Sequence, residues 1–227
     1  MISLWVESAS TYAESIDNLI LLVGVLVGFW GGIALAVMFL FMWMFREREG
    51  VPTTYVTGKE PELKRWITIP HWVIIACDGL IIWGAISVWY NVKQHKPAPE
   101  QVIRVTGVQW TWLFQHPGPD GELDTDDDIH TADDLHIEVD TIYHFQLEAA
   151  DVMHSFSVPV FRLKQDAIPG RRITGWFEAT KTGEYDIQCA EMCGIGHGLM
   201  QGRIHIETPV EHAAWMASAT LTAATGN

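Results

Sequence analysis

Two long apolar runs, followed by a series of short alternating segments, divide the chain into two parts. Leu19 to Phe45 holds 27 residues without a charge, whereas roughly 20 apolar residues suffice for a helix to cross a bilayer. Trp66 to Val92 is a second run of this kind, in which only the side chains of His71 and Asp78 ordinarily carry a charge between pH 5 and 8. The pattern predicts two transmembrane helices that form a hairpin within residues 1–96.

The basic residues around these runs predict how the hairpin crosses the membrane. The first 18 residues contain no Lys or Arg. The loop between the runs carries Arg46, Arg48, Lys59, Lys64 and Arg65. Because short loops rich in Lys and Arg stay in the cytoplasm, we expect this loop inside the cell, and both termini and the rest of the chain on the outer side.

Residues 97–227 show the alternation of a β-rich domain. Pro97 and Pro99 stiffen a short linker, and beyond them segments rich in Val, Ile, Thr and aromatic residues are separated by Gly, Pro and Asp turns. Such segments indicate an antiparallel β-sandwich. The expected strands lie near 101–106, 108–115, 135–139, 142–148, 154–158, 171–178, 183–188 and 201–206. Thr208, Pro209 and Glu211 then have the spacing of a capping box, which predicts a short final helix with Trp215 packed on the sandwich or on a neighbour.

Alternation also sorts the histidines of this domain. His136, His144 and His205 fall opposite the apolar residues of their strands, which predicts them as surface residues. His154 differs, because it follows the turn at Asp151 and begins an apolar strand. A metal ligand can lie at such a strand edge.

Residues 189–200 gather the side chains with the most specific chemistry. The stretch reads Cys189-Ala-Glu-Met-Cys193-Gly-Ile-Gly-His197-Gly-Leu-Met200, and its glycines allow the backbone to fold tightly. Two thiols, an imidazole and a thioether are soft ligands that select copper over hard cations. A mononuclear blue-copper centre uses one thiolate, so the second cysteine favours two thiolates that bridge two metals. We call residues 189–200 the copper loop.

A disulfide, a zinc site and a c-type haem site each fit the copper loop less well. A disulfide between Cys189 and Cys193 is geometrically possible in an oxidising compartment, but it does not account for His197 and Met200. A zinc site more often has two residues between its cysteines and seldom uses methionine. A c-type haem site needs two residues between the cysteines and a histidine directly after the second, whereas here three residues intervene and glycine follows.

The motif C-x-E-x-C-G-x-x-H-x-x-M resembles the binuclear copper A loop of subunit II of haem–copper cytochrome c oxidases. A second stretch, Asp151-Val-Met-His154-Ser-Phe-Ser-Val-Pro159 running on to Arg171, is similar to the family's other copper segment. The resemblance implies an all-β cupredoxin-like Greek-key sandwich, anchored by the N-terminal two-helix transmembrane hairpin in a bacterial cell membrane.

The resemblance also implies how two copper ions would be bound. His154 and Met200 would ligate one ion, and His197 and the backbone carbonyl of Glu191 the other. Both cysteines would bridge the ions, and the Glu191 side chain would reach a magnesium ion shared with subunit I. The implied metal ligands are thus His154, Cys189, Glu191, Cys193, His197 and Met200.

Electrons are expected to reach this centre through Trp110. Gly107-Val-Gln109-Trp110-Thr-Trp112 is similar to the family's electron-accepting motif, which uses the first tryptophan. Trp112 is expected in the core, although alternation would place both tryptophans on one face. In the family, cytochrome c or a cytochrome c domain gives the electron, which passes to haem in subunit I, where oxygen is reduced to water and protons are pumped. Subunits I and III and the membrane are the implied partners; haem lies only in the partner subunit, and nucleic acid is not a partner.

Two other classes share part of this pattern. A quinol oxidase subunit II has the hairpin and sandwich but lacks the copper ligands, all of which appear here. Nitrous oxide reductase has a similar copper loop but would require a large further domain and no membrane hairpin.

Many relatives in the subunit II family place a proton-channel glutamate at the position where this chain has Leu63, and Glu62 stands one residue earlier. The proton-channel role is therefore not carried over to Glu62.

The distribution of acidic residues along the chain suggests a docking surface for a partner. The whole chain has a net charge of −14, and residues from Pro97 onward hold 7 basic against 20 acidic residues. Half of these acids lie between Asp120 and Asp140 without a basic residue among them; we call residues 120–140 the acidic stretch. It would steer a cationic partner to this side, and solubility in a salt-adapted protein is the competing interpretation. A calcium loop is disfavoured because the required glycine is missing.

Overall fold

The computed structural model describes residues 6–52 and 55–225, which form two compact units. One unit is a helical hairpin from Asp17 to Tyr90, and the other joins the residues before Asp17 to those from Asn91 onward. The predicted hairpin region 1–96 and outer domain 97–227 also include residues 1–5, 53–54 and 226–227, which lie outside the described residues. The segment before Asp17, expected with the hairpin, packs with the β-rich unit.

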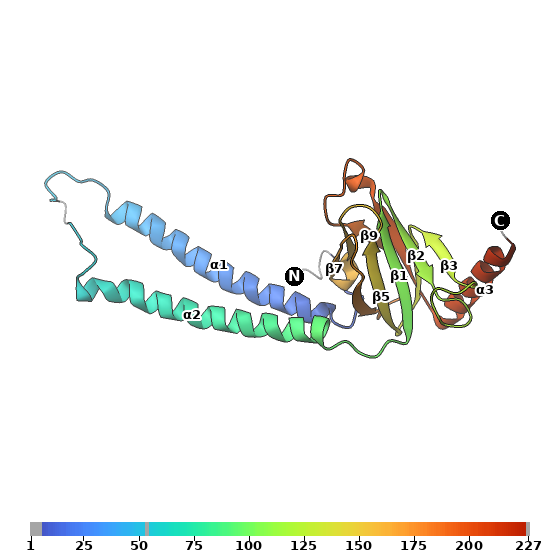
Figure 1. Ribbon diagram of the computed structural model, residues 1–227. Helices are drawn as coiled ribbons and strands as arrows, with labels where there is room; N and C mark the ends of the chain where they lie inside the picture. The colour runs from blue at the N-terminus through green and yellow to red at the C-terminus, as the bar shows by residue number, and fades with distance from the viewer. Residues whose placement is uncertain (1–5, 53–54, 226–227) are drawn as a thin grey trace. The chain divides into compact units, whose positions relative to one another are not determined.

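The hairpin consists of helices α1 (Ala13–Met44) and α2 (Pro61–Trp89), which lie close together at one end and diverge toward the loop that joins them (Figure 1). The chain after α2 continues as a π-helical turn, Tyr90–Gln94. Helix α1 and the span Pro61–Gln94, which comprises α2 and this turn, are each long and apolar enough to cross a membrane. α2 begins earlier than the predicted residue 66 because proline occupies its first turn, where a missing N–H leaves no helical hydrogen bond unmade.

The β-rich unit is a sandwich of two five-stranded sheets. One sheet has the order β3-β2-β1-β5-β8, and the other the order β4-β10-β9-β6-β7. The strands are β1 (Gln101–Val108), β2 (Thr111–His116), β3 (Ile129–Ala132), β4 (Asp134–Glu138), β5 (Ile142–Ala149), β6 (His154–Val158), β7 (Leu163–Ala167), β8 (Ile173–Glu178), β9 (Gly183–Cys189) and β10 (Gln201–Glu207). Short 3-10 helices span Pro159–Phe161 and His197–Leu199.

All eight predicted strands are present, and the predicted fold class is confirmed. Two strands, β3 and β7, were not predicted, and the expectation of purely antiparallel sheets was wrong. β1 pairs with β5, and β4 with β10, in parallel. The predicted strand at 108–115 is also interrupted, because Gln109 and Trp110 form the turn between β1 and β2.

Aromatic side chains fill the space between the two sheets. Trp112 and Phe145 come from one sheet and Phe156 from the other, and all three are fully buried. The ring of Phe156 meets that of Trp112 at 5.4 Å and that of Phe145 at 5.8 Å between centroids, within the range of favourable aromatic pairs. This rigid core supports the strand ends that carry the site.

Trp176 on β8 fastens the sandwich to both chain segments that flank the hairpin. Its ring packs edge-on against Tyr12, with centroids 5.2 Å apart, and its indole N–H donates to the carbonyl of Val92 at 2.9 Å. Ser10 adds a bridge to Ala179 and donates from its hydroxyl to the carbonyl of Phe161 at 3.0 Å. The residues just before α1 are therefore part of the sandwich.

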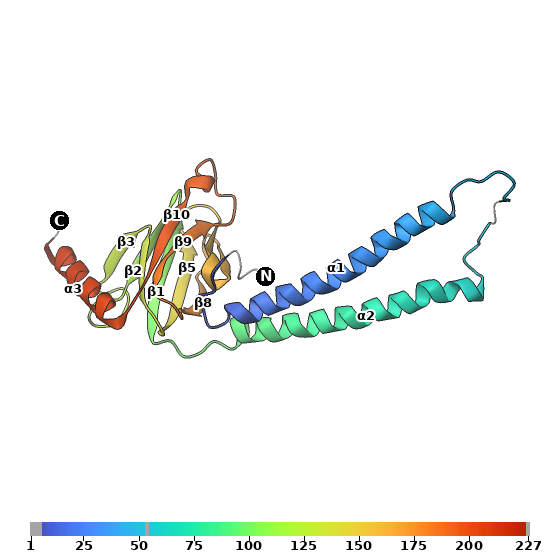
Figure 2. The same cartoon turned by 180° about the vertical axis from the view of Figure 1, so that it is seen from behind.

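The chain ends in helix α3 (Pro209–Thr225), which contacts β3, β4 and β10 and lies at one end of the sandwich (Figures 1 and 2). The predicted capping box is present, since Thr208 Oγ1 donates to Glu211 Oε2 at 2.7 Å and the N–H of Glu211 points back to Thr208 Oγ1 at 3.4 Å. Trp215 packs on the sandwich as expected. Its ring stacks on His136, so His136 is half-buried rather than a free surface residue.

Candidate metal centre

The copper loop joins the end of β9 to the start of β10 and forms the projecting tip seen in Figure 1. Its sulfur atoms lie close together. Cys193 Sγ is 3.8 Å from Cys189 Sγ, 3.8 Å from Met200 Sδ and 3.7 Å from His197 Nδ1. Cys189 Sγ is 3.3 Å from the carbonyl oxygen of Glu191. The loop therefore brings its five implied ligands to a single place.

Strand pairing brings the sixth implied ligand, His154, to the same place. Cys189 at the end of β9 pairs with Phe156 of β6, and the N–H of Ala190 donates to the carbonyl of Ser155 at 2.9 Å. His154 is the first residue of β6 and is fully buried. Ligand atoms of His154, Cys189 and Cys193 all lie within 4.8 Å of one another, which makes this group a candidate metal site.

The orientation of His154 fits a metal ligand. Its Nε2 lies 2.8 Å from Asp151 Oδ1, whereas its Nδ1 is buried without a hydrogen-bond partner among the described residues. A buried imidazole nitrogen without a partner is unfavourable, and a metal ion would provide that partner. A carboxylate on the other ring nitrogen is the usual way in which a metal-binding imidazole is oriented.

The two cysteines fit a bridging role better than a disulfide. Both are free, and their 3.8 Å separation is far beyond the roughly 2.05 Å of an S–S bond. Burial, together with the neighbouring Cys189 thiol, raises the pKa of Cys193 to about 11. The cysteine therefore keeps its proton near neutral pH until a cation displaces it.

Glycines allow the surrounding backbone to close on these ligands. A Cβ at Gly107 of β1 would lie 2.9 Å from Cδ2 of His154, and one at Gly196 would lie 2.4 Å from Cδ2 of Trp110. Both distances are too short for a side chain, so glycine is required at both positions. Gly107 lets the imidazole approach β1, and Gly196 lets the copper loop lie against Trp110.

The two tryptophans of the motif after β1 have different environments. Trp110 is 40% exposed and its ring lies against the copper loop, whereas Trp112 is fully buried. The prediction that Trp112 belongs to the core is confirmed. The two tryptophans do not share a face, as strand alternation would require, because Trp110 lies in the turn and β2 begins only at Thr111.

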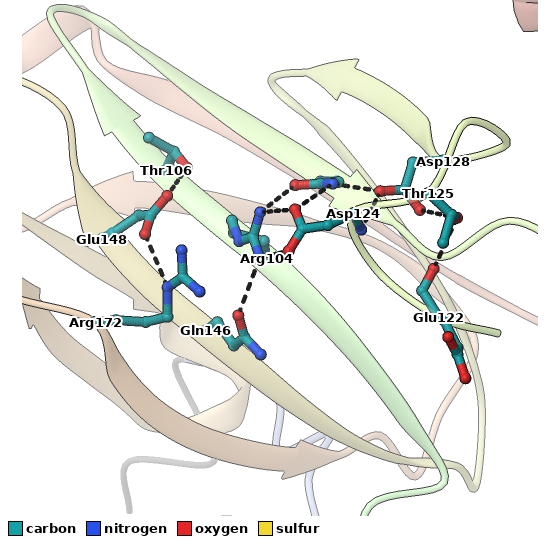
Figure 3. Close-up of polar contacts among 10 residues, drawn as sticks. Arg104, Thr106, Glu122, Asp124, Thr125, Asp128, Gln146, Glu148 and Arg172 are labelled. Carbon is teal, nitrogen blue, oxygen red and sulfur yellow. Dashed lines mark hydrogen bonds and ion pairs between the residues drawn. The ribbon is translucent and has the colours of Figure 1, made fainter.

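Part of the acidic stretch is used inside the fold (Figure 3). Asp124 forms two contacts with the guanidinium of Arg104, at 2.6 and 2.8 Å, and hydrogen bonding to Arg104 lowers the pKa of Asp124 to about 2. Asp128 is buried and accepts the N–H of Asp124 at 2.7 Å and the side-chain amide of Gln115. These acids stabilise the loop between β2 and β3, while Glu122 and Asp126 are exposed.

Two further residues of the site were not predicted from the sequence. Asp151 holds Nε2 of His154, and Gln109 donates from its side-chain amide to the carbonyl of Cys193 at 2.7 Å. Asp151 lies in the stretch that resembles the second copper segment, and Gln109 precedes Trp110, so both positions adjoin predicted site residues. Their hydrogen bonds, which join distant segments, are visible only in the structure.

Residues 101–208 match the family described as cytochrome c oxidase subunit II, periplasmic domain. An alternative cytochrome c oxidase subunit 2 of Bradyrhizobium diazoefficiens is 29% identical over 220 residues, which cover 84% of this chain and 76% of that protein. The cytochrome c oxidase subunit 2 of Thermostichus vulcanus is 43% identical over 118 residues, covering 52% of this chain and 33% of that protein.

Among solved structures, the periplasmic domain of subunit II of cytochrome oxidase from Bradyrhizobium japonicum superposes with a TM-score of 0.51 at 29% identity. The superposition covers 56% of this chain and 99% of that domain. The fold and site thus define a membrane-anchored cupredoxin-like protein with a soft-metal group at its loop end. Residues 101–208 thus form a periplasmic domain of the cytochrome c oxidase subunit II type, the family that this part of the chain matches.

Proposed function

We propose that this chain is the electron-accepting subunit of a cytochrome c oxidase and binds a binuclear copper A centre. The convergence of the predicted ligands carries this proposal, together with the buried Nδ1 of His154, which has no partner in the described part of the chain. A thiol-rich set that includes methionine favours copper over zinc or a hard cation. When bound, the copper pair would supply a one-electron carrier.

The protein residues would divide the work of holding the metal. Cys189 and Cys193 would bridge the ions, His154 and Met200 would complete one ligand set, and His197 with the Glu191 carbonyl the other. Asp151 would keep the His154 ring oriented through Nε2. Because Met200 is only 2% exposed and Cys193 only 3%, the fold would exclude water from that side of the site.

Cytochrome c, or a cytochrome c domain, is the proposed donor. It would dock over Trp110, whose exposed ring offers a flat contact surface beside the copper loop. The electron would leave towards haem in subunit I, where oxygen reduction and proton pumping would occur. The side chain of Glu191, half-buried on the copper loop, would reach a magnesium ion shared with subunit I; subunit III is a further proposed partner.

The hairpin would place this site on the outer side of a bacterial cell membrane. Three basic residues in the loop between α1 and α2 and two more at the start of α2 support a cytoplasmic position for that loop. Both termini and the copper domain would then face outward, where a periplasmic donor can reach them.

Copper analysis of the oxidase complex that contains the full chain tests the proposed centre. We expect two coppers per chain from this site and an electron paramagnetic resonance signal of one electron shared by both ions. Cys189→Ser and Cys193→Ser should each abolish that signal, whereas Cys77→Ser in α2 should retain it. Two electronically coupled coppers in Cys193→Ser would contradict the proposal.

A further inference from the structure

The turn between β1 and β2 connects the two halves of the candidate metal centre. The backbone N–H of Gln109 donates to Asp151 Oδ2 at 2.7 Å, and the other carboxylate oxygen of Asp151 lies 2.8 Å from Nε2 of His154. The side-chain amide of Gln109 donates to the carbonyl of Cys193 at 2.7 Å. One residue therefore reaches both the His154 segment and the copper loop.

Trp110, the next residue, depends on this turn for its position. A Cβ at Gly194 would lie 3.3 Å from the Nε1 and Cζ2 atoms of Trp110, and one at Gly196 only 2.4 Å from Cδ2. The indole thus lies on the loop backbone while 40% of the residue stays exposed. The ring thus packs on the loop at two glycines, whereas Gln109 is joined to the site by two hydrogen bonds.

We propose that Gln109 is a positioning residue that holds Trp110 against the copper loop and links it to the backbone of Cys193. This inference rests on the proposed function and adds a residue to it. Electronic coupling falls more steeply across a van der Waals gap than through covalent and hydrogen bonds. The path from Trp110 through Gln109 to the Cys193 carbonyl needs only the single hydrogen bond of 2.7 Å to reach a bridging ligand.

Gln109→Met is the informative change, because methionine is also unbranched and of similar length but cannot donate a hydrogen bond. Gln201→Met is the matched control, since Gln201 is exposed and adjoins the ligand Met200. The first measurement is amide hydrogen exchange of the metal-free full chain in detergent. We expect faster exchange in residues 108–112 and 194–199 of Gln109→Met only, by about fivefold for one lost neutral hydrogen bond.

The second measurement uses the copper-loaded oxidase complex and a photoreducible cytochrome c. In Gln109→Met, electron arrival should slow about fivefold, while copper content, the spectrum of the copper pair and donor affinity stay at the values of Gln201→Met. Unchanged exchange and unchanged arrival would overturn the inference. Loss of copper in Gln109→Met would also overturn it, because the residue would then be needed to hold the metal. Absence of a copper pair even in the unmutated chain would instead refute the proposed function, leaving the exchange result to judge the hydrogen bond alone.

Discussion

The indole of Trp215 stacks on the imidazole of His136, with ring centroids 4.3 Å apart and planes inclined by 9°. His136 stacks in turn on His205 at 4.4 Å. The Glu207 carboxylate lies 2.8 Å from Nδ1 of His136 and 2.9 Å from Nδ1 of His212. Because the family match ends at residue 208, these contacts attach a helix that lies beyond the matched domain.

Removing the Trp215 ring should release α3 from the sandwich. We expect Trp215→Ala to lower the local opening free energy of α3 by about 2 kcal/mol, from lost apolar burial and ring stacking. Amide hydrogen exchange of α3 in the full chain should rise about thirtyfold. Leu221→Ala, at a position 68% exposed on the same helix, is the control. Equal exchange in the two variants would show that stacking does not hold the helix.

Acid should loosen the same attachment. Burial, with smaller effects of His136, His212 and His130, lowers the pKa of His116 to about 3, and His116 meets Trp215 edge-on at 5.0 Å. Burial also lowers the pKa of His136, against the opposing effect of Glu207 and Asp134 and with a further lowering by His205.

The direction follows from the lowered pKa values. Above an unfolded-state pKa of about 6.5 both histidines are neutral in either state, and below it the detached state takes up protons more readily. Attachment of α3 should therefore be strongest above this pH and weaken as the pH falls from about 7.5 to 5.5. Amide hydrogen exchange of α3, corrected for its intrinsic pH dependence, measures how firmly the helix is attached. We expect this attachment to depend less steeply on pH in His116→Leu. A slope that is unchanged in His116→Leu would assign the effect to other groups.

Replacing Met200 should change the redox potential more than the metal content. Met200→Leu preserves side-chain volume and would remove the proposed thioether ligand. A weak thioether ligand tunes the potential of a copper site more than it holds the metal. We expect two coppers per chain and a shifted midpoint in a redox titration. Met192→Leu, 72% exposed on the same loop, should behave as the unmutated chain. Loss of copper in Met200→Leu would mean that the thioether is a main ligand.

If Trp110 is the proposed point of electron entry, Trp110→Ala should slow the arrival of electrons from cytochrome c severalfold, because the electronic coupling through the ring would be lost. Copper content and donor affinity should change little. Flash-induced reduction at a fixed, saturating donor concentration measures the step, and Leu113→Ala, at a position 42% exposed on β2, is the control. Unchanged kinetics in Trp110→Ala would place the route elsewhere.

Docking through the acidic stretch can be tested without disturbing the fold. Glu122→Gln with Asp126→Asn removes two exposed charges, and Glu178→Gln with Glu184→Gln removes one half-buried and one exposed charge outside the stretch. Charges at the surface are screened over about 10 Å at 0.1 M salt. The first pair should slow association with a basic cytochrome c and flatten its salt dependence, with little effect on transfer once bound.

The outcomes of this comparison separate docking from solubility as the role of the acids. Equal losses in both pairs would show that the overall negative field suffices. No loss in either pair would favour solubility. Asp124 and Asp128 are unsuitable for this test, because their carboxylates bond to Arg104 and to the Asp124 N–H within the fold.

The sandwich, and the spacing of the residues that could bind metal, could be predicted from the sequence because both depend on local patterns. β3 and β7 were missed for the same reason. Leu163–Ala167 has only three polar residues between two apolar ends, and Ile129–Ala132 is a short segment inside the acidic stretch. β7 forms by pairing with β6, and β3 by pairing with β2. A local sequence pattern does not show which segments will pair.

The environment of the site was predictable only in part. Spacing alone indicated which residues could bind metal, but the partner of each polar atom depends on segments distant in the chain. Gln109 and Cys193 are separated by 84 positions, and His136 is covered by a helix at the end of the chain. Alternation therefore placed His136 on the correct face and still missed its burial.

The contacts of Trp176 show that the hairpin is inserted within the β-rich unit in the sequence, because chain segments on both sides of the hairpin belong to that unit. The chain leaves the β-rich unit after Ile16 and returns at Asn91. Tyr12, before the exit, and Val92, after the return, contact the same indole. A fragment that starts at Pro97 lacks both contacts and uncovers an aromatic ring. A soluble version of this protein should therefore splice residues 6–16 directly to residue 91 through a short flexible linker.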